Sequence, residues 1–296
     1  MKANVITPLP GPRSRKVLES LKQKNGAFNL DHAYVHSGEG KGSHFQDLDG
    51  NTFLDFSAQI ASNPLGYNNP IMQRVLRKHG EKTPIKYGGQ DFATREHEEL
   101  LSELLKVVPK EMNAAFLINS GAEANENALK IAVRRNPSAK FGISFQNGWH
   151  GRTSGALSLT NSKAVQVKHY FKIPVKRLPY TEQAADELEN MIRRECDPSE
   201  IGFIIMESVQ GEGGYIPAPP KMVKDIRSMT KKYGIPLICD EVQSGMGRTG
   251  KWWAYEHYGI VPDIQSSAKM LQVAATIANR KWFPKEGSAI SSTWGG

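Results

Sequence analysis

Short apolar segments and longer amphipathic segments alternate through the second half of this sequence, and this alternation constrains its fold more than any other feature. Short apolar runs have the length of buried strands, whereas the longer segments between them have helical spacing. We expect, in chain order, strand 114–118, helix 122–135, strand 141–145, helix 184–195, strand 202–206, helix 221–233 and strand 235–239. This order favours a mostly parallel sheet covered by helices on both faces, and so an α/β fold.

The sequence before this region has a different pattern. Residues 44–56 alternate between apolar and polar side chains around an Asp-Gly-Asn turn, which predicts a β-hairpin. Helical spacing is expected at residues 14–24, 71–79 and 94–107. The chain therefore begins with elements that do not belong to the strand–helix alternation.

The composition is that of a soluble globular chain, with 39% hydrophobic and 23% charged residues among 296. No run of about 18 apolar residues is present, so no membrane partner is expected. The N-terminus lacks the apolar region of a secretory signal, and two cysteines make no disulfide framework, so we expect a cytoplasmic location. The net charge of +8 indicates either a generally basic surface or nucleic-acid binding through residues 13–16 and 168–177. No known nucleic-acid-binding module surrounds these clusters, and we expect no nucleic-acid partner.

An acid and a lysine follow the last of the expected strands. Asp240 stands at the end of strand 235–239, a glycine-rich loop follows, and a second short run leads to Lys269. Ligands of open α/β sheets bind beyond the carboxyl ends of the strands. An acid and a lysine there suit pyridoxal 5'-phosphate, which bonds to a lysine through its aldehyde and takes an acidic partner for its ring nitrogen. We assign these roles to Asp240 and Lys269, with a solvated surface lysine as the alternative for the latter.

Two further turns that follow strands have more than one interpretation. Residues 119–126 lead from a strand into a helix, and a helix N-terminus after small residues binds phosphate. Ser120 with Glu123 equally fits a capping box, which would make the turn structural. Trp149 lies among glycines after the next strand, where an aromatic ring either stacks on a planar ligand or closes the edge of the core. The residues alone leave these alternatives open.

Residues 236–272 resemble the signature of the class III aminotransferases, which belong to the fold type I pyridoxal phosphate enzymes. Further stretches that resemble motifs of this family are residues 119–126, 147–153, 207–214 and 291–296. In the third of them, Ser208 stands where the family has proline. The resemblance implies that Ser120, Gly121 and Ala122 hold the cofactor phosphate, that Trp149 lies on the cofactor ring, and that Gln243 binds the ring hydroxyl. It implies that Arg152 and Glu212 face the substrate, and that Glu207 and His150 support the site from behind. It also implies that Thr293 reaches the cofactor phosphate of a neighbouring subunit.

The same resemblance implies an architecture. Residues 1–59 are expected to be the N-terminal segment of a smaller domain, and residues 60–296 the large cofactor-binding α/β domain. The C-terminal small domain that the family carries is expected to be absent from this chain. Because the Thr293 contact crosses between subunits, a homodimer with shared active sites is expected.

The expected activity is transfer of an amino group from an amine donor to a 2-oxo acid by a ping-pong mechanism. Residues 61–66, 158–161 and 271–273 are most similar to the lysine 6-aminotransferase branch, which implies the ω-amine of lysine, or of a similar diamino or ω-amino acid, as donor to 2-oxoglutarate. Ornithine, acetylornithine and 4-aminobutyrate stay open as donors. Racemases, decarboxylases and aminomutases share these motifs, and a truncated, catalytically silent chain is a further alternative.

Overall fold

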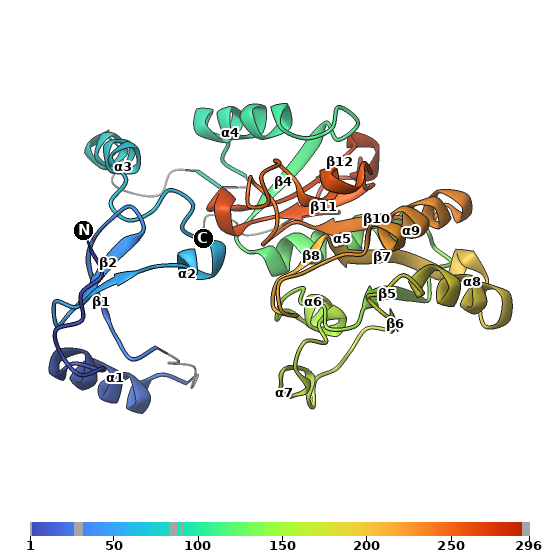
Figure 1. Ribbon diagram of the computed structural model, residues 1–296. Coiled ribbons are helices and arrows are strands. Elements are labelled where there is room, and N and C mark those ends of the chain that lie inside the picture. Colours follow the sequence, from blue (N-terminus) through green and yellow to red (C-terminus); the bar gives the residue numbers. More distant parts are fainter. Residues whose placement is uncertain (1, 27–31, 83–87, 90, 292–296) are drawn as a thin grey trace. The chain divides into compact units, whose positions relative to one another are not determined.

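The computed structural model describes residues 2–26, 32–82, 88–89 and 91–291 (Figure 1). The chain divides into two compact units, Met1–Lys86 and Tyr87–Gly296. The first unit thus extends past residue 59 and includes α3 (Pro70–Lys82). The domain boundary expected after residue 59 stays a prediction.

The first unit is built around a three-stranded antiparallel sheet. Its strands, in spatial order, are β1 (His36–Lys41), β2 (His44–Asp47) and β3 (Thr52–Leu54). The hairpin expected from the sequence is confirmed as β2 and β3, with Phe45 opposite Phe53. These two rings stack with centroids 5.2 Å apart, so the apolar positions of the alternating pattern lie on one face of the sheet.

Short helices accompany this sheet. The turn of the hairpin caps α1 (Pro12–Lys24), because Asp49 accepts hydrogen bonds from the backbone N–H groups of Arg13 and Ser14. The element α2 (Ala58–Ala61) is a left-handed turn, since φ at its four residues lies between 48° and 62°.

The second unit contains a seven-stranded sheet (Figure 1). Its strands, in spatial order, are β4 (Ala114–Ile118), β12 (Ala274–Ala278), β11 (Ile264–Ser267), β10 (Leu237–Asp240), β7 (Ile201–Glu207), β5 (Phe141–Phe145) and β6 (Val175–Leu178). The pairs from β11 to β6 are parallel, whereas β12 is antiparallel to both β11 and β4. The predicted α/β fold with a mostly parallel sheet is confirmed.

Helices pack on both faces of this sheet. They are α4 (Arg95–Lys106), α5 (Gly121–Arg134), α6 (Ser154–Leu159), α8 (Ala184–Arg194) and α9 (Pro220–Tyr233), and the short α7 (Ala164–Val167) contacts α6. Apolar residues of α5 and α6 pack with Phe203 and Ile205 of β7, whereas residues of α4, α8 and α9 pack with Ile204 and Met206. Burial of alternate residues on opposite faces explains why the whole of β7 is apolar up to its last residue.

This topology places the ends of several strands along one edge of the sheet. The parallel strands β5, β7 and β10 end close to Trp149, Glu207 and Asp240, and β11 leads to Lys269. A small two-stranded ribbon, β8 (Val209–Gln210) and β9 (Ile216–Pro217), follows β7. Across the described ranges, no helix is long and apolar enough to cross a membrane.

Candidate active site

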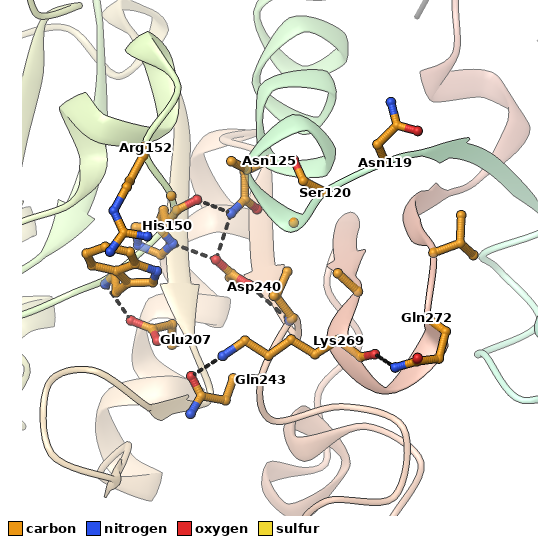
Figure 2. Close-up of a pocket in the computed structure, with 17 residues that line it drawn as sticks. Asn119, Ser120, Asn125, His150, Arg152, Glu207, Asp240, Gln243, Lys269 and Gln272 are labelled. Atoms are coloured by element: carbon orange, nitrogen blue, oxygen red, sulfur yellow. Dashed lines mark hydrogen bonds and ion pairs between the residues drawn. The ribbon is translucent and has the colours of Figure 1, made fainter. Parts of the chain in front are cut away.

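A cavity of about 440 Å³ lies at this edge, within the second unit (Figure 2). Most of the residues that the sequence predicted for the site line it, namely Ser120, Gly121, Ala122, Trp149, His150, Arg152, Glu207, Asp240, Gln243 and Lys269. Glu212 is exposed and does not line the cavity, although its charge acts on Lys269. Thr293 lies outside the described residues. Segments far apart in the sequence thus meet around one cavity.

Lys269 lies in the turn between β11 and β12 and is half-buried. Its Nζ donates a hydrogen bond of 2.9 Å to Oε1 of Gln243. Burial lowers the pKa of Lys269, and the charges of Glu212 and Asp240 oppose this shift only in part. A lysine with a lowered pKa has more of its neutral amine near pH 7, and the neutral amine is the form that attacks an aldehyde.

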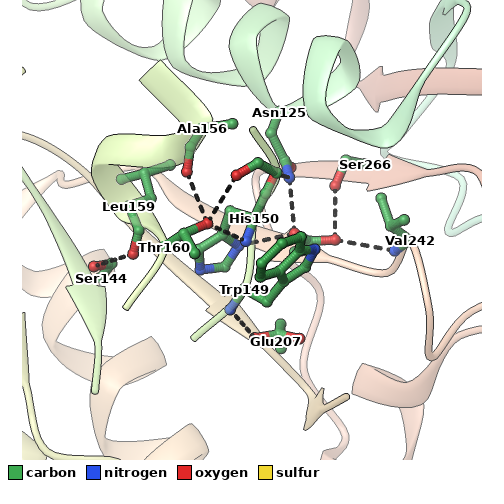
Figure 3. A network of polar contacts seen from close by, with 12 residues as sticks. Asn125, Ser144, Trp149, His150, Ala156, Leu159, Thr160, Glu207, Val242 and Ser266 are labelled. Carbon is green, nitrogen blue, oxygen red and sulfur yellow. Dashed lines mark hydrogen bonds and ion pairs between the residues drawn. The ribbon is translucent and has the colours of Figure 1, made fainter. Parts of the chain in front are cut away.

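Asp240 is 4% exposed, and Figure 3 shows the residues that donate hydrogen bonds to it, Asn125, His150, Val242 and Ser266. Oδ2 lies 2.8 Å from Nδ2 of Asn125 and 2.8 Å from Nδ1 of His150. Oδ1 accepts from the backbone N–H of Val242 at 3.1 Å and from the hydroxyl of Ser266 at 3.4 Å. The carboxylate is therefore held in one orientation by four partners from four different segments.

His150 and Glu207 behind the cavity affect each other's charge. Burial disfavours the charged imidazole of His150, but the hydrogen bond and charge of Asp240 outweigh it, and the pKa of His150 is raised. Burial also raises the pKa of Glu207 to about 7, although backbone N–H groups of Trp149 and Gly211 donate to its carboxylate at 2.9 and 3.2 Å. Burial thus favours the neutral carboxyl of Glu207, whereas Asp240 favours the charged imidazole of His150.

The N-terminus of α5 meets the cavity at Ser120, Gly121 and Ala122. Ser120 accepts a hydrogen bond from the backbone N–H of Glu123 and donates one to its carboxylate, so Ser120 is the N-cap of α5, while its binding of phosphate stays a prediction. The backbone N–H groups of a first helical turn have no partner within the helix, and the helix dipole makes this end positive. A Cβ on Gly121 would come within 2.7 Å of Val242, so glycine allows the helix to approach the loop after β10. Capping and anion binding are therefore compatible here.

Arg152 and Trp149 form one wall of the cavity. The guanidinium carbon of Arg152 lies 4.5 Å from the centroid of the Trp149 ring, which is a cation–π contact. Arg152 is exposed, and the planar fork of a guanidinium can pair with a carboxylate in two parallel hydrogen bonds while its face covers the indole. The predicted stacking of Trp149 on a cofactor ring stays a prediction.

Sequence reasoning missed Asn125 and Glu241. Asn125 lies four residues after Gly121 on the same face of α5, and this spacing was the signal that would have placed it at the cavity. Its Nδ2 donates both to Asp240 and to the backbone carbonyl of His150, at 2.8 Å each. Asn125 thus holds both the carboxylate of Asp240 and the backbone of His150, whose ring contacts the same carboxylate.

Glu241 was visible in the sequence only as the second of two acids. It is 1% exposed and its carboxylate accepts four hydrogen bonds, from Ser208 Oγ at 2.6 Å, Ser244 Oγ at 3.0 Å, Ala254 N at 2.9 Å and Tyr255 N at 3.1 Å. These bonds close the loop that contains Gln243 and tie it to the end of β7. Ser208, which departs from the family pattern, supplies one of the four donors.

The buried Glu241 predicts a pH dependence of stability. Burial raises its pKa from 4.5 to about 7 in the folded chain. A group with a raised folded-state pKa contributes stability that is complete below its unfolded pKa and is lost as the pH rises through the folded value. The shift corresponds to about 3 kcal/mol. We expect the free energy of unfolding of Glu241→Gln, measured with urea between pH 4.5 and 8, to fall less steeply with pH than that of wild type.

The control for this measurement is Glu200→Gln. Glu200 pairs with Lys140 at the surface, and its replacement leaves the buried network intact. Its pH profile should follow that of wild type. Parallel profiles for wild type and Glu241→Gln would contradict the assignment of a raised pKa to Glu241.

A family model described as aminotransferase class III matches residues 26–296. The chain belongs to this family. The resemblance inferred from the sequence motifs is therefore confirmed. The chain is 31% identical to the 4-aminobutyrate aminotransferase of Dictyostelium discoideum, over 99% of this chain and 68% of the relative. It is 38% identical to the LysW-aminoadipate semialdehyde/glutamate semialdehyde transaminase of Sulfolobus acidocaldarius, over 79% of this chain and 58% of the relative.

Solved structures of class III aminotransferases have the same fold. The lysine aminotransferase of M. tuberculosis is 26% identical and superposes with a TM-score of 0.85, over 96% of this chain and 73% of that one. The chain spans between 58% and 68% of the length of the two curated relatives above. Both relatives and the solved structure carry transaminase names with different substrates.

The family uses pyridoxal phosphate, in agreement with the cofactor expected from the sequence. The residues around the cavity fit this cofactor. Nε2 of Gln243 is a buried donor with no partner among the described residues, and it lies beside Lys269 where a ring hydroxyl would accept from it. Asp240 offers a carboxylate for a protonated ring nitrogen, and the N-terminus of α5 offers N–H groups for a phosphate.

Proposed function

We propose that this chain forms the site of a pyridoxal phosphate-dependent aminotransferase, which moves an amino group from an amine donor to a 2-oxo acid. The proposal is supported above all by one observation, the meeting of Lys269, Asp240 and Gln243 around a single cavity. Each of the three would take a different atom of the cofactor. Pyridoxal phosphate, when bound, supplies an electron-accepting ring to a carbon that loses a proton.

The residues of the chain have separate tasks in this reaction. The amine of Lys269 would hold the cofactor aldehyde and, when the substrate amine takes that place, would move a proton at the substrate carbon. Asp240 would keep the ring nitrogen protonated, since a nearby carboxylate favours the charged form. Asn125 and His150 keep Asp240 in place, and the fixed orientation avoids reorganisation during the reaction.

We infer that the donor is a diamino or ω-amino acid that presents its terminal amine, with lysine favoured. The relatives support this class, because 4-aminobutyrate and lysine both combine a terminal amine with a distant carboxylate. Arg152 would bind that carboxylate at the wall of the cavity. Glu212 is exposed and its charge acts on Lys269, which supports a role towards the substrate outside the lining of the cavity.

A donor panel tests this proposal. Lysine, ornithine, acetylornithine and 4-aminobutyrate are each supplied with 2-oxoglutarate, and kcat/KM is measured for each. We expect lysine to give the highest value. If another donor exceeds lysine by more than about tenfold, equivalent to about 1.4 kcal/mol of transition-state preference, lysine is wrong while amino-group transfer stands. Cofactor binding without turnover of any donor would favour the catalytically silent alternative.

We also propose a homodimer. Apolar side chains on α3 are exposed, among them Ile71 at 60% and Leu76 at 66%, and no residue of this helix is buried. Exposed apolar faces of this kind mark protein contacts. Light scattering after gel filtration should give twice the mass of one chain, and a monomer at micromolar concentration would contradict the proposal.

A further inference from the structure

The turn that carries Lys269 contains two residues in the left-handed region. It runs from the end of β11 at Ser267 to the start of β12 at Ala274. Within it, φ is 34° at Lys269 and 62° at Gln272. For a residue with a Cβ, the left-handed region costs on the order of 1 kcal/mol, whereas glycine adopts it freely. Position 272 is therefore one where glycine would relieve strain, yet glutamine occupies it.

The side chain of Gln272 makes a contact that glycine cannot make. Its Nε2 donates to the backbone carbonyl of Lys269 at 2.7 Å, and its backbone N–H donates to the same oxygen at 3.1 Å (Figure 2). The carbonyl of the preceding residue, Ala268, accepts from the backbone N–H of Leu271 at 2.7 Å. One residue thus supplies two donors to the carbonyl of Lys269 and fixes the plane of its peptide group.

Holding this peptide group in place restrains the backbone of Lys269. The backbone atoms N, Cα and C set the direction of the Cα–Cβ bond, and from there the side chain extends to Gln243 Oε1, 2.9 Å from Nζ. Both Gln272 and Lys269 line the cavity. A side chain retained in a strained backbone position at a cavity indicates a function that offsets the strain.

We propose that Gln272 is a positioning residue for Lys269, which holds the backbone carbonyl of the lysine through its side-chain amide and thereby directs the amine towards the cofactor aldehyde. The role assigned to Lys269 rests on the proposed function. Gln272 needs no contact with substrate for this role, and its effect is exerted through the geometry of the turn.

Three substitutions separate the contact from the strain. Gln272→Glu keeps size and shape but replaces the donor by an oxygen that repels the carbonyl. Gln272→Ala removes the contact and keeps the strain, whereas Gln272→Gly removes both. We expect Gln272→Gly to melt at a higher temperature than Gln272→Ala. All three variants should form the covalent bond between Lys269 and pyridoxal phosphate at least about fivefold more slowly than wild type, because the amine is no longer directed.

A second measurement uses the protein without cofactor. Competitive amine labelling followed by peptide mass spectrometry gives the labelling of Lys269 as a function of pH. With its backbone released, the amine should leave its half-buried place, and the labelling midpoint of Gln272→Glu and Gln272→Ala should move up towards that of an ordinary lysine. A residue that only stabilised the fold would lower the melting temperature and leave this midpoint unchanged. Gln183→Glu, on the surface before α8, introduces the same charge as a control.

The outcomes distinguish this inference from the proposed function. If wild type fails to bond pyridoxal phosphate at Lys269, the proposed function is wrong, and the labelling midpoints still test Gln272. If wild type forms the bond and all three variants match it within about twofold, with unchanged midpoints, the positioning role of Gln272 is wrong and the proposed function stands.

Discussion

Replacement of Lys269 by alanine is expected to abolish covalent retention of pyridoxal phosphate and to lower amino-group transfer by at least about 10³-fold. The change removes both the amine that holds the aldehyde and the base that moves the proton. Among the described residues that line the cavity, no second lysine is present to replace it. Borohydride reduction followed by peptide mapping should place the cofactor mass on the Lys269 peptide of wild type and on no peptide of the variant.

Lys176→Ala is the matched control for this prediction. Lys176 pairs with Glu195 at 2.7 Å on the edge strand β6, and its removal takes away one surface lysine without touching the cavity. Reduced cofactor should remain on Lys269 in this variant, and the rate should be that of wild type. Multiple turnovers by Lys269→Ala would contradict the assignment of Lys269 as the residue that bonds to the cofactor, because the described lining of the cavity contains no second lysine.

The strands that the sequence predicted best are those with a continuous apolar run between polar neighbours. Strands 114–118 and 141–145 were predicted at both ends, and both lie in the buried sheet. Strand 202–206 was predicted to within one residue at each end. These segments are largely apolar and lie in the sheet, with Ser144 as the one polar residue within the three predicted ranges, so the polar residues on either side mark their limits.

Among the strands that the sequence did not predict, β6 and β12 were missed for different reasons. Strand β6 (Val175–Leu178) is at the edge of the sheet, and the lysine and arginine in its centre hide it among basic residues. Strand β12 (Ala274–Ala278) contains three alanines, which have little strand preference of their own, and only one threonine and one isoleucine. It forms a strand because its backbone pairs with β11 on one side and β4 on the other, and this pairing is a tertiary effect.

In the candidate site, too, some features could be predicted from the sequence and others could not. Asp240 and Lys269 were predictable because their residue types match the chemistry of one cofactor. The packing of Glu241 was not, since only Ser244 among its four donors is close in sequence, whereas Ser208 follows β7 and the N–H groups of Ala254 and Tyr255 come from a segment more than ten residues later. The contact of Gln272 with the Lys269 carbonyl depends on a backbone conformation that no residue pattern specifies.

Asp240→Asn is expected to weaken cofactor binding and to lower amino-group transfer by about 10²- to 10³-fold. Asparagine has the size of aspartate but no charge, so it cannot favour the protonated ring nitrogen. The substitution also replaces one carboxylate oxygen by an NH₂ group, which is a donor. The groups around it, such as the backbone N–H of Val242, are donors as well, so hydrogen bonds to this position are lost. The change should therefore be visible without substrate, as a fall in the pKa of His150 measured by NMR, because Asp240 is the main cause that raises it.

Asp263→Asn separates this effect from a general loss of stability. Asp263 also joins a strand of the same sheet, but at the start of β11, where it accepts from Arg227 at 2.7 Å and from the backbone N–H of Leu237 at 2.9 Å. Its replacement breaks a partly buried ion pair away from the cavity, so it should lower the melting temperature while the His150 pKa and the rate stay within about twofold of wild type. A normal rate in Asp240→Asn would refute the ring-nitrogen role, whatever its melting temperature. If Asp240→Asn lowers the rate but leaves the pKa of His150 unchanged, the role of Asp240 towards the cofactor stands. The assignment of Asp240 as the cause of the raised His150 pKa is then wrong.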